Sequence, residues 1–439
     1  MTPAIDELLV DAAPTKDFFI SMLVRDIQLI PAVIDLVDNC IDGAIRHRAD
    51  GSYAGLHVAI TIGTDRFRIV DNCGGIPLSL ARDYAFRFGR AEGMAQTPHS
   101  IGEFGVGMKR GLFKLGNYFE VRSDTTSDRF VLKVDVQQWR ADPDWHFRFD
   151  SIDRQGVESD EAGTMIEVRE LHPSVSRDFE RQQFLNDLTE RIAAVHQDSM
   201  DRGLVLSVNG VPINIDPAQL LESDELKAAC EEIVLDGTSP VDIKLYTGLG
   251  TSSPTAAGWY VFCNGRAVLE ADQTIVTGWG ADEGETIPRM HNQFARFRGY
   301  AFFTCDDAGR LPWTTTKTGV DANSDVFRQA RSRMVKLMRP VIDFLNQLDR
   351  EKDAPPADME LLEDMVNAAQ PKRIGELATI SRFTAPPRPK VRLPDTQSIQ
   401  FRVEKERADK AKKVLKVSTL GEVGRRTFDY FYKLECEET

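Results

Sequence analysis

The stretch PAVIDLVDNCIDGAIR, residues 31–46, decides how the rest of this chain is interpreted. Its apolar residues recur at steps of three and four, the spacing of one helix face, so we predict a helix over 26–48. Asp35, Asn39 and Asp42 lie at i, i+4 and i+7 and therefore share a face. Oxygen ligands on a face that ought to be apolar indicate either a solvated face or a buried site for Mg²⁺.

An apolar hairpin follows this helix. Alternation predicts strands at 57–62 and 66–70, and the sequence IVDNCGGIP places Asp71 at the end of the second strand. The two glycines after it allow backbone to approach a flat ligand closely. An aspartate at such a place can accept a hydrogen bond from an exocyclic amino group such as that of adenine, although the letters also suit a simple Asp-Asn-Gly turn.

A glycine-rich loop comes third, in SIGEFGVGMKRG at 100–111. Gly102, Gly105 and Gly107 make the loop flexible, and a helix is expected to begin at Met108. Backbone N–H groups at such a loop and helix start bind phosphate, and Lys109 adds a positive charge. The order of residues is not that of a Walker loop.

Taken in this order, the three elements resemble the motifs of the GHKL ATPase superfamily, which includes gyrase, the large heat-shock chaperones, sensor histidine kinases and MutL. DLVDNCIDGA at 35–44 looks like the family's E-L-V-[ED]-N-x-x-D-A helix, IVDNCGGI looks like its D-x-G-x-G motif, and IGEFGVGMK looks like its lid. Gly163 and Thr164 match a later Gly-Thr pair.

This resemblance implies ATP and Mg²⁺ as cofactors. It implies that Asn39 binds the metal, that Asp71 recognises adenine, that Gly75 shapes the base pocket and that the loop covers the phosphates. The nucleotide-binding residues implied in this way are Asn39, Asp71, Gly75, Ile76, Gly102, Phe104, Gly105, Val106, Gly107, Met108, Lys109 and Thr164.

The catalytic position departs from the family pattern. Asp35 stands where the family has glutamate, and its side chain is one methylene shorter. The carboxylate is therefore withdrawn by roughly an ångström from the water that it would polarise. We expect either a slow ATPase with Asp35 as the base, or a chain that binds ATP chiefly as a switch.

A second set of elements follows. Strands are predicted at 204–210, 241–247, 258–270 and 300–306, before a long helix over 324–349 that Pro340 should kink. GWYVFCNGRAV at 258–268 resembles the Asn-Gly-Arg strand of the transducer domain in MutL, gyrase and MORC proteins. LPWTTTKTGVD at 311–321 looks like the transducer loop whose lysine reaches the γ-phosphate, so Lys317 is the second candidate catalytic residue; the alternative is a surface lysine. Nearby arginines either contact nucleic acid or brace the domain: Arg289, Arg296 and Arg298.

The predicted fold class is α+β, in four parts. A GHKL (Bergerat) ATP-binding sandwich occupies 1–200 and an α/β transducer domain 201–350. A Pro-rich linker with one short helix near 357–369 occupies 351–395, and a basic strand-helix-helix segment occupies 396–439. The last segment is either ribbon-helix-helix-like, with Gln400 and Arg402 reading DNA, or a helical dimerisation or docking tail.

Charge and cysteine usage constrain the setting. The net charge is −14, but residues 371–439 hold sixteen basic and ten acidic residues, a net of +6, which leaves −20 for the first 370. A polyanion is therefore expected to touch the basic end. The six cysteines are scattered without paired spacing, and no stretch is apolar enough to span a membrane. These features are typical of a cytoplasmic protein with no membrane partner.

The resemblance is closest to bacterial MORC-like and MutL-like proteins and covers about 15–345. It implies an ATP-dependent homodimer that clamps or remodels DNA, frequently in defence against foreign DNA. An ATP-binding switch with little turnover that controls a partner effector is the alternative, and a chaperone-like ATPase is the third. A histidine kinase is disfavoured because no histidine precedes the first helix.

Overall fold

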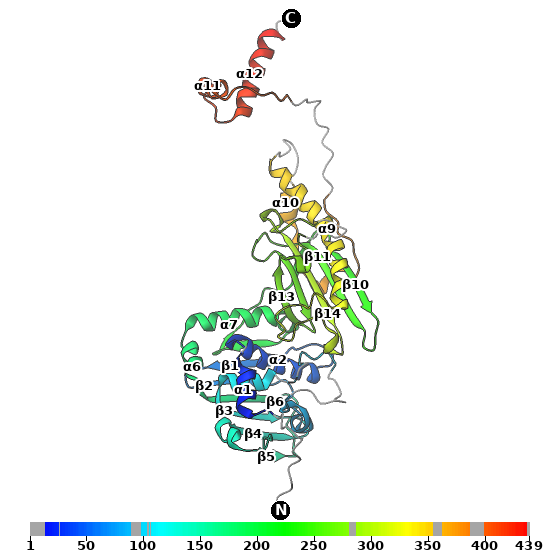
Figure 1. Cartoon of the computed structure of the whole chain (residues 1–439). Coiled ribbons are helices and arrows are strands. Elements are labelled where there is room, and N and C mark those ends of the chain that lie inside the picture. Colours follow the sequence, from blue (N-terminus) through cyan, green and yellow to red (C-terminus); the bar gives the residue numbers. More distant parts are fainter. Residues whose placement is uncertain are drawn as a thin grey trace, which may run out of the picture. The chain divides into compact units, whose positions relative to one another are not determined.

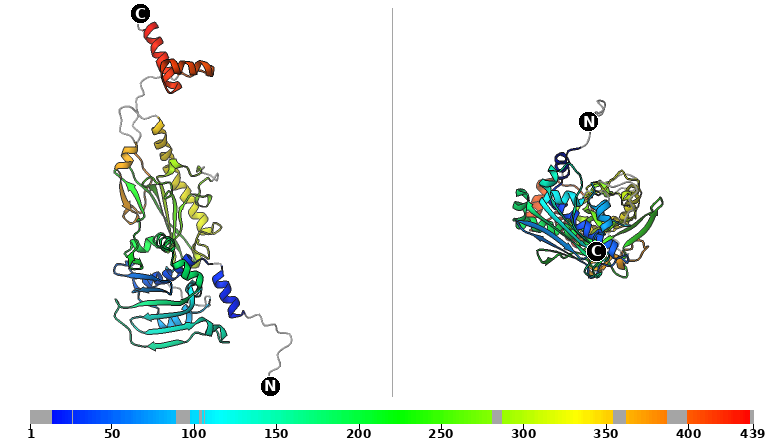
Figure 2. Two further views of the ribbon diagram at one scale, coloured as in Figure 1. Left: turned by 90° about the vertical axis from the view of Figure 1, so that its left-hand side faces the viewer. Right: turned by 90° about the horizontal axis from the view of Figure 1, so that it is seen from below.

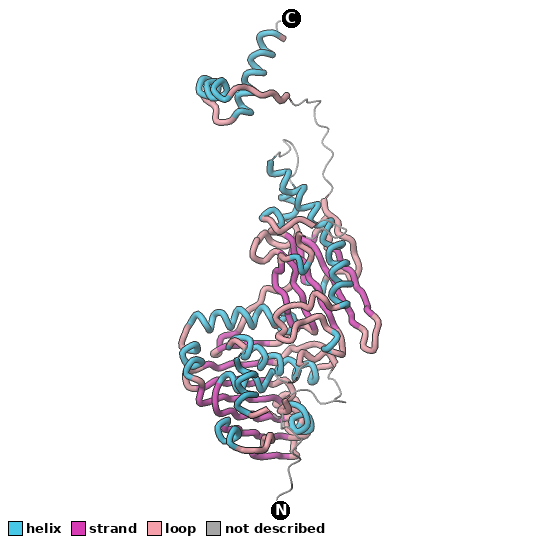
Figure 3. Tube along the Cα trace, viewed as in Figure 1, coloured by secondary structure: helices cyan, strands magenta, loops and turns pink. Residues whose placement is uncertain are grey.

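The computed structural model describes residues 14–25, 27–88, 98–102, 105, 107–280, 287–353, 362–386 and 399–436. It divides the chain into two compact units, Met1–Arg388 and Pro389–Thr439 (Figure 1). The first unit contains two large sheets, which Figure 3 draws in magenta. We call the part up to residue 213 the first lobe and residues 214–386 the second lobe.

The first lobe is built on an eight-stranded sheet in the order β5-β4-β3-β6-β2-β1-β7-β8. All pairs are antiparallel except β1 with β7, which is parallel. The strands are β1 (His57–Ile62), β2 (Arg66–Asp71), β3 (Gly116–Asp124), β4 (Arg129–Asp135), β5 (Phe149–Asp153), β6 (Gly163–Leu171), β7 (Val205–Val208) and β8 (Val211–Pro212).

Helices complete this lobe, and α2 is its central element. The helices are α1 (Lys16–Arg25), α2 (Leu29–His47), α3 (Leu78–Leu80), the π-helix η1 (Ala81–Ala85), α4 (Gly107–Leu115), α5 (Val136–Ala141), α6 (Pro173–Phe179), α7 (Gln182–Val195) and α8 (Gln197–Asp201). The apolar face of α2, including Val33 and Val37, lies in one core with β1 residues such as Val58 and Ile60. The helix predicted over 26–48 is therefore confirmed, with ends at 29 and 47.

The second lobe has a five-stranded sheet in the order β10-β11-β14-β12-β13. The strands are β10 (Ala229–Leu235), β11 (Val241–Leu249), β12 (Gly258–Cys263), β13 (Arg266–Asp272) and β14 (Phe297–Thr304). The long helix α9 (Asp325–Asp353), labelled in Figure 1 and yellow in Figure 2, packs along β11 and β14. Short 3₁₀ turns complete the lobe: η2 (Ile275–Thr277), η3 (Asn292–Phe294), η4 (Ala308–Arg310) and η5 (Ile374–Glu376).

The structure corrects three sequence-based assignments. The strand expected at 204–210 to open the second set is β7, which pairs with β1 in the first sheet. The apolar spacing near 176–197 predicts one helix, whereas the structure has two helices there, α6 and α7. The helix expected over 324–349 runs to Asp353, with Pro340 inside it, and so continues into the predicted linker.

The predicted linker over 351–395 is also corrected, because residues 362–386 fold onto the second lobe. Helix α10 (Leu362–Ala368) begins where the Leu362 N–H donates to the buried Glu351 carboxylate at 2.7 Å. Strand β15 (Gln370–Arg373) then pairs with β9 (Gln219–Glu222), and Lys227 bridges Thr384. The part of the predicted short helix before residue 362 lies outside the described residues.

The second unit is a helical hairpin of α11 (Lys405–Leu415) and α12 (Leu420–Glu435). A capping box between Thr419 and Glu422 starts α12. Residues 399–404 of the strand predicted at 398–404 have no regular structure, and no strand among the described residues pairs with them; residue 398 lies outside the described residues. Across the described parts of the chain, no helix has the length and apolar character that a membrane crossing requires.

Candidate nucleotide site

The acids of α2 are buried, as a binding site requires and a solvated face does not. Asp35, Asp38 and Asp42 are 6%, 2% and 8% exposed. Helix α4 approaches α2 closely because Gly111 has no side chain; a Cβ there would lie 2.9 Å from the Ala32 carbonyl oxygen. The polar face of α2 is therefore enclosed, so each of its carboxylates needs a partner.

Asp35 finds its partner on α4. Its Oδ2 lies 2.7 Å from Nη2 of Arg110, in an ion pair. Burial raises the pKa of Asp35, the neighbouring Asp38 raises it further, and Lys317 and Arg110 oppose the rise. Asn39, one turn along, donates from Nδ2 to the Asp35 carbonyl oxygen at 2.6 Å. That bond uses the amide nitrogen and orients the Asn39 side chain.

Asp38 is the centre of a buried cluster assembled from both lobes. Its Oδ2 accepts a hydrogen bond from Nζ of Lys317 at 3.2 Å, and its Oδ1 lies 3.3 Å from Nε of Arg266. His196 Nε2 is 3.8 Å from the same Oδ1. Burial alone would raise the pKa of Asp38, but Arg266 and Lys317 outweigh it and lower this pKa below its usual value.

This cluster contains a buried arginine whose donors are not all used. Burial lowers the pKa of His196 to about 3, so its ring is neutral at pH 7. Asp38 is thus the carboxylate that pairs with both Arg266 and Lys317, and the Arg266 Nη1 atom is buried without a hydrogen-bond partner. Buried cations with unused donors beside α2 are suited to an anion.

Lys317 reaches α2 from the second lobe, and its backbone has an uncommon conformation. It lies in the loop between η4 and α9 with a positive φ of 53°, which is uncommon for a residue with a side chain. The residue is 9% exposed, and its Nζ lies 5.7 Å from the centre of the Trp313 ring. The alternative of a surface lysine is thereby excluded.

The base side of the site is made by the ends of β2 and β6. Asp71 and Thr164 face each other in the strand register, and Asp71 Oδ1 accepts from the backbone N–H of Thr164 at 3.2 Å and of Cys73 at 2.8 Å. Burial raises the pKa of Asp71. Gly163 is required because a Cβ there would lie 1.9 Å from the Asp71 carbonyl oxygen.

Gly75 and Ile76 lie beside these residues and are held by β3. Gly75 has a φ of 72°, and a Cβ on it would lie 2.4 Å from the Asp124 carbonyl oxygen. The Ile76 N–H donates to Ser123 Oγ at 2.6 Å. The sequence-predicted base residues therefore come together as one local structure of the first lobe.

Asp42 anchors the start of the glycine loop. Its Oδ1 accepts from the Ile101 N–H at 2.6 Å and its Oδ2 from the Gly102 N–H at 2.9 Å. The second lobe holds the same segment, because Nδ2 of Asn264 donates to the Ser100 carbonyl oxygen at 3.1 Å and to Cys305 O at 3.0 Å. The start of the glycine loop is therefore held by hydrogen bonds from both lobes.

The remaining predicted loop residues fall into two groups. Gly105 has a φ of 62°, and Gly107 begins α4 beside Asp35, with buried Met108 after it. Phe104 and Val106 lie outside the described residues.

Lys109 has a different environment from the one predicted. It is 2% exposed and its Nζ donates to the Ala85 carbonyl oxygen at 2.8 Å. Burial lowers its pKa to about 7. In this structure its amine is thus occupied by the backbone rather than presented to solvent.

Sequence reasoning missed the residues that tie this site together. Asp38, Arg110 and Arg266 stand inside quoted motifs, at positions to which no role was given, and His196 has no sequence signal. For Arg296 and Arg298, the contacts favour the alternative in which these arginines brace the domain. Arg298 donates to the carbonyl oxygens of Ala295, Phe297 and Thr251, and Arg296 donates to Asn367 on α10.

The residues present fit a magnesium ion held jointly with phosphate. No group of three or more His, Cys, Asp or Glu side chains is arranged around a common metal position in the described residues. Mg²⁺ bound with a nucleotide takes only one or two protein oxygens and completes its shell with phosphates and water. The oriented amide of Asn39 supplies one such oxygen.

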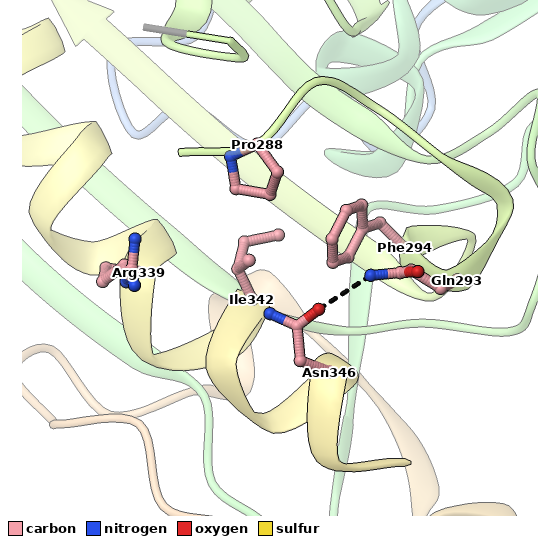
Figure 4. A pocket seen from close by; sticks show the side chains of 6 residues that line it. All are labelled: Pro288, Gln293, Phe294, Arg339, Ile342 and Asn346. Carbon is pink, nitrogen blue, oxygen red and sulfur yellow. Dashed lines mark hydrogen bonds between the residues drawn. The ribbon is translucent and has the colours of Figure 1, made fainter. Parts of the chain in front are cut away.

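A cavity elsewhere in the second lobe is separate from these residues. It has a volume of about 300 Å³ and is lined by residues of η3 and α9 with Pro288 (Figure 4). Gln293 donates to Asn346 across it at 2.7 Å. None of the sequence-predicted site residues lines this cavity.

Comparison with known proteins agrees with this geometry. Residues 27–164 match the family model described as histidine kinase-, DNA gyrase B- and HSP90-like ATPase. No curated protein matches the chain. The matched range contains α2, the base residues and the loop, whereas the second lobe and the helical hairpin lie beyond it. The match supports a GHKL-type ATPase domain in this part of the chain, with ATP as its ligand.

Proposed function

We propose that this chain is a slow Mg²⁺-dependent ATPase whose second lobe detects the terminal phosphate of ATP through Lys317. One observation carries the proposal: Nζ of Lys317 is buried on Asp38, one helical turn from the candidate base Asp35. A lysine from a distant part of the chain makes this contact only if the second lobe is placed against α2. Its charge can neutralise the negative charge that develops on the γ-phosphoryl group.

Each side of the site has its own task in this proposal. Asp71 accepts from the adenine amino group, and Asn39 holds Mg²⁺, which would neutralise phosphate charge when bound. Asp35 takes the proton of the attacking water. In the structure Arg110 pairs with the Asp35 carboxylate. Because that ion pair lowers the basicity of Asp35, Arg110 must turn toward the phosphates before Asp35 can act as a base.

We further propose that ATP brings two copies together and that the pair acts on DNA, as a bacterial MORC-like or MutL-like protein in defence against foreign DNA. The support is the likeness of 258–268 and 311–321 to transducer motifs, together with the basic charge after residue 371. In this proposal the second lobe is the transducer.

A switch with little turnover, controlling a partner effector, is the second candidate. Two features favour it: the short Asp35 side chain and its pairing with Arg110. Both withhold the base from water while leaving the ATP-binding residues intact. ATP binding, not phosphate release, would then be the signal.

Phosphate release by the full chain, with and without DNA, separates the two candidates. We expect slow turnover in the parent, unmeasurable ATP binding in Asn39→Ala, and a bound, dimeric state without turnover in Asp35→Ala. ATP binding without phosphate release under all conditions would select the switch. Hydrolysis by Asp35→Ala at the parent rate would show that Asp35 is not the base.

Lys317→Met tests the observation that carries the proposal. We expect turnover to fall by about 100-fold with ATP affinity within about threefold, since the lysine acts mainly on developing charge. Lys336→Met, which removes an exposed lysine of α9, is the matched control and should leave turnover unchanged. Equal turnover in the two variants would sink the role of Lys317.

A further inference from the structure

The helical hairpin of the second unit lacks an apolar core. Among its described residues, 399–436, only Ala408 is buried. Domains this small rarely reach stability without disulfides, metals or a partner. Cys436 is the one cysteine of this unit and is free. The hairpin is nonetheless fully formed, with Arg426 Nη1 donating to the Leu415 carbonyl oxygen at 3.1 Å.

Helix α12 divides into two sides. Leu420, Thr427, Phe431 and Leu434 follow one another at steps of seven, four and three, which places them along one line of the helix. Charged residues gather on the other side at helical spacing: Glu422, Arg425, Arg426, Asp429 and Lys433. Glu435, in the last turn, is the one charged residue on the apolar side.

The apolar side is exposed. Phe431 is 57% exposed and Leu420 59%, and the flanking aromatic residues Phe428, Tyr430 and Tyr432 are between 48% and 71% exposed. We call this set, with Leu434, the α12 apolar face. Six large side chains open to water on one helix make an apolar patch at the upper end of what monomeric surfaces carry, and such patches are often interaction sites.

We propose that the α12 apolar face binds the same face of a second copy of this chain, and that this contact forms without nucleotide. Aromatic side chains bury about 150–250 Å² each. At roughly half exposure, six residues offer about 600 Å² per copy and about 1,200 Å² per pair, which reaches the range of stable interfaces. If a two-fold axis relates the two copies, each apolar face covers the other. The two hairpins then form a four-helix bundle.

The charges favour a second copy over a polyanion on this face. The basic residues Arg426 and Lys433 lie on the side of α12 away from Leu420 and Phe431, and Arg425 borders the face at Tyr432; phosphate contacts are made by such basic residues. Pairing of the apolar faces leaves these cations at the outside of the bundle. None of the residues involved belongs to the nucleotide site, so the contact is independent of the ATP-dependent association proposed above.

Sedimentation of the full chain without nucleotide tests this inference. We expect a dimer at micromolar concentration. In Phe431→Ala the dissociation constant of the dimer should be at least 30-fold higher. Alanine keeps the helix propensity high, so loss of the helix itself does not explain that effect. Lys433→Ala is the matched control on the charged side of α12, and its dissociation constant should stay within threefold of the parent's.

Three results would overturn the inference. One is a parent chain that stays monomeric at tens of micromolar. This includes a monomer in which another part of the same chain covers the α12 apolar face and protects it from hydrogen exchange. Another is a dimer that Phe431→Ala leaves unaltered. The third is association that requires DNA. Asn39→Ala should remain dimeric, and this separates failure of the contact from failure of the proposed ATPase.

Discussion

The two sides of the candidate nucleotide site are held by different kinds of interaction. The base side, around Asp71, consists of backbone hydrogen bonds among β2, β3 and β6, all in the first lobe. The phosphate side, around Asp38, consists of charged side chains from α2, β13 and the Lys317 loop, with the neutral ring of His196 beside them. The base side is therefore complete in the first lobe alone, whereas the phosphate side exists only when the second lobe is in place.

Removal of the Asp38 carboxylate should break the phosphate side most severely. In Asp38→Ala, Arg266 and Lys317 lose their common counter-ion while Arg266 remains buried. Breaking a buried pair in this way costs about 3–5 kcal/mol in the free energy of unfolding. Urea denaturation measures the loss; a loss below about 1 kcal/mol would mean that water or another anion already balances these cations.

An added methyl group should disturb the base side next. In Gly163→Ala the new Cβ would lie 1.9 Å from the Asp71 carbonyl oxygen, so the strand pair has to shift. We expect about 2 kcal/mol of lost stability, together with weaker ATP binding. The control is Gly319→Ala, in the Lys317 loop, where only Thr314 Cγ2 is near, at 4.0 Å. If calorimetry finds equal ATP affinity in both variants, the base side is less rigid than its geometry implies.

Asn264 allows the connection between the lobes to be tested. Its φ of 47° suits glycine, so Asn264→Gly removes the side-chain bonds to Ser100 and Cys305 without backbone strain. We expect a loss of about 1–2 kcal/mol and faster hydrogen exchange at 98–102.

Asn209→Gly is the matched control for this change. Asn209 also has a positive φ, of 49°, but its side chain bonds Ile62 within the first lobe. It should lose similar stability and leave exchange at 98–102 unaltered. The same exchange in both variants would contradict the role of Asn264 as a link.

The smallest expected effect is on pH dependence, through Lys109. Its folded pKa of about 7 lies below that of the unfolded chain, so the unfolded state binds more protons above pH 7. The contribution of this residue to stability therefore rises with pH, by about 1 kcal/mol between pH 7 and 8. Lys109→Met should remove that rise from urea midpoints; a parallel pH profile in parent and variant would show that the amine stays charged when folded.

The sequence predicted the local parts of the fold and not the contacts between distant parts. Periodicity was sufficient for α2, because its apolar face is continuous, and the motif order was sufficient for Asp71 and Thr164, because paired strands bring them together. The parallel pairing of β7 with β1 has no local signal, so β7 was assigned to the wrong sheet. Similarly, nothing near residue 362 or residue 196 indicates that Glu351 or Asp38 will be the partner.

That parallel pairing has a mechanical consequence. Thr164, Asp71, Val58 and Leu206 stand opposite one another in turn on β6, β2, β1 and β7. One row of the sheet therefore runs from the candidate adenine contact to Leu206 on β7, whose carbonyl oxygen accepts from the Ile213 N–H at 2.9 Å, where the chain leaves for the second lobe. A displacement of the second lobe at this point acts on hydrogen-bonded strands and not on a flexible loop. The base side of the site and the attachment of the second lobe are therefore expected to move together.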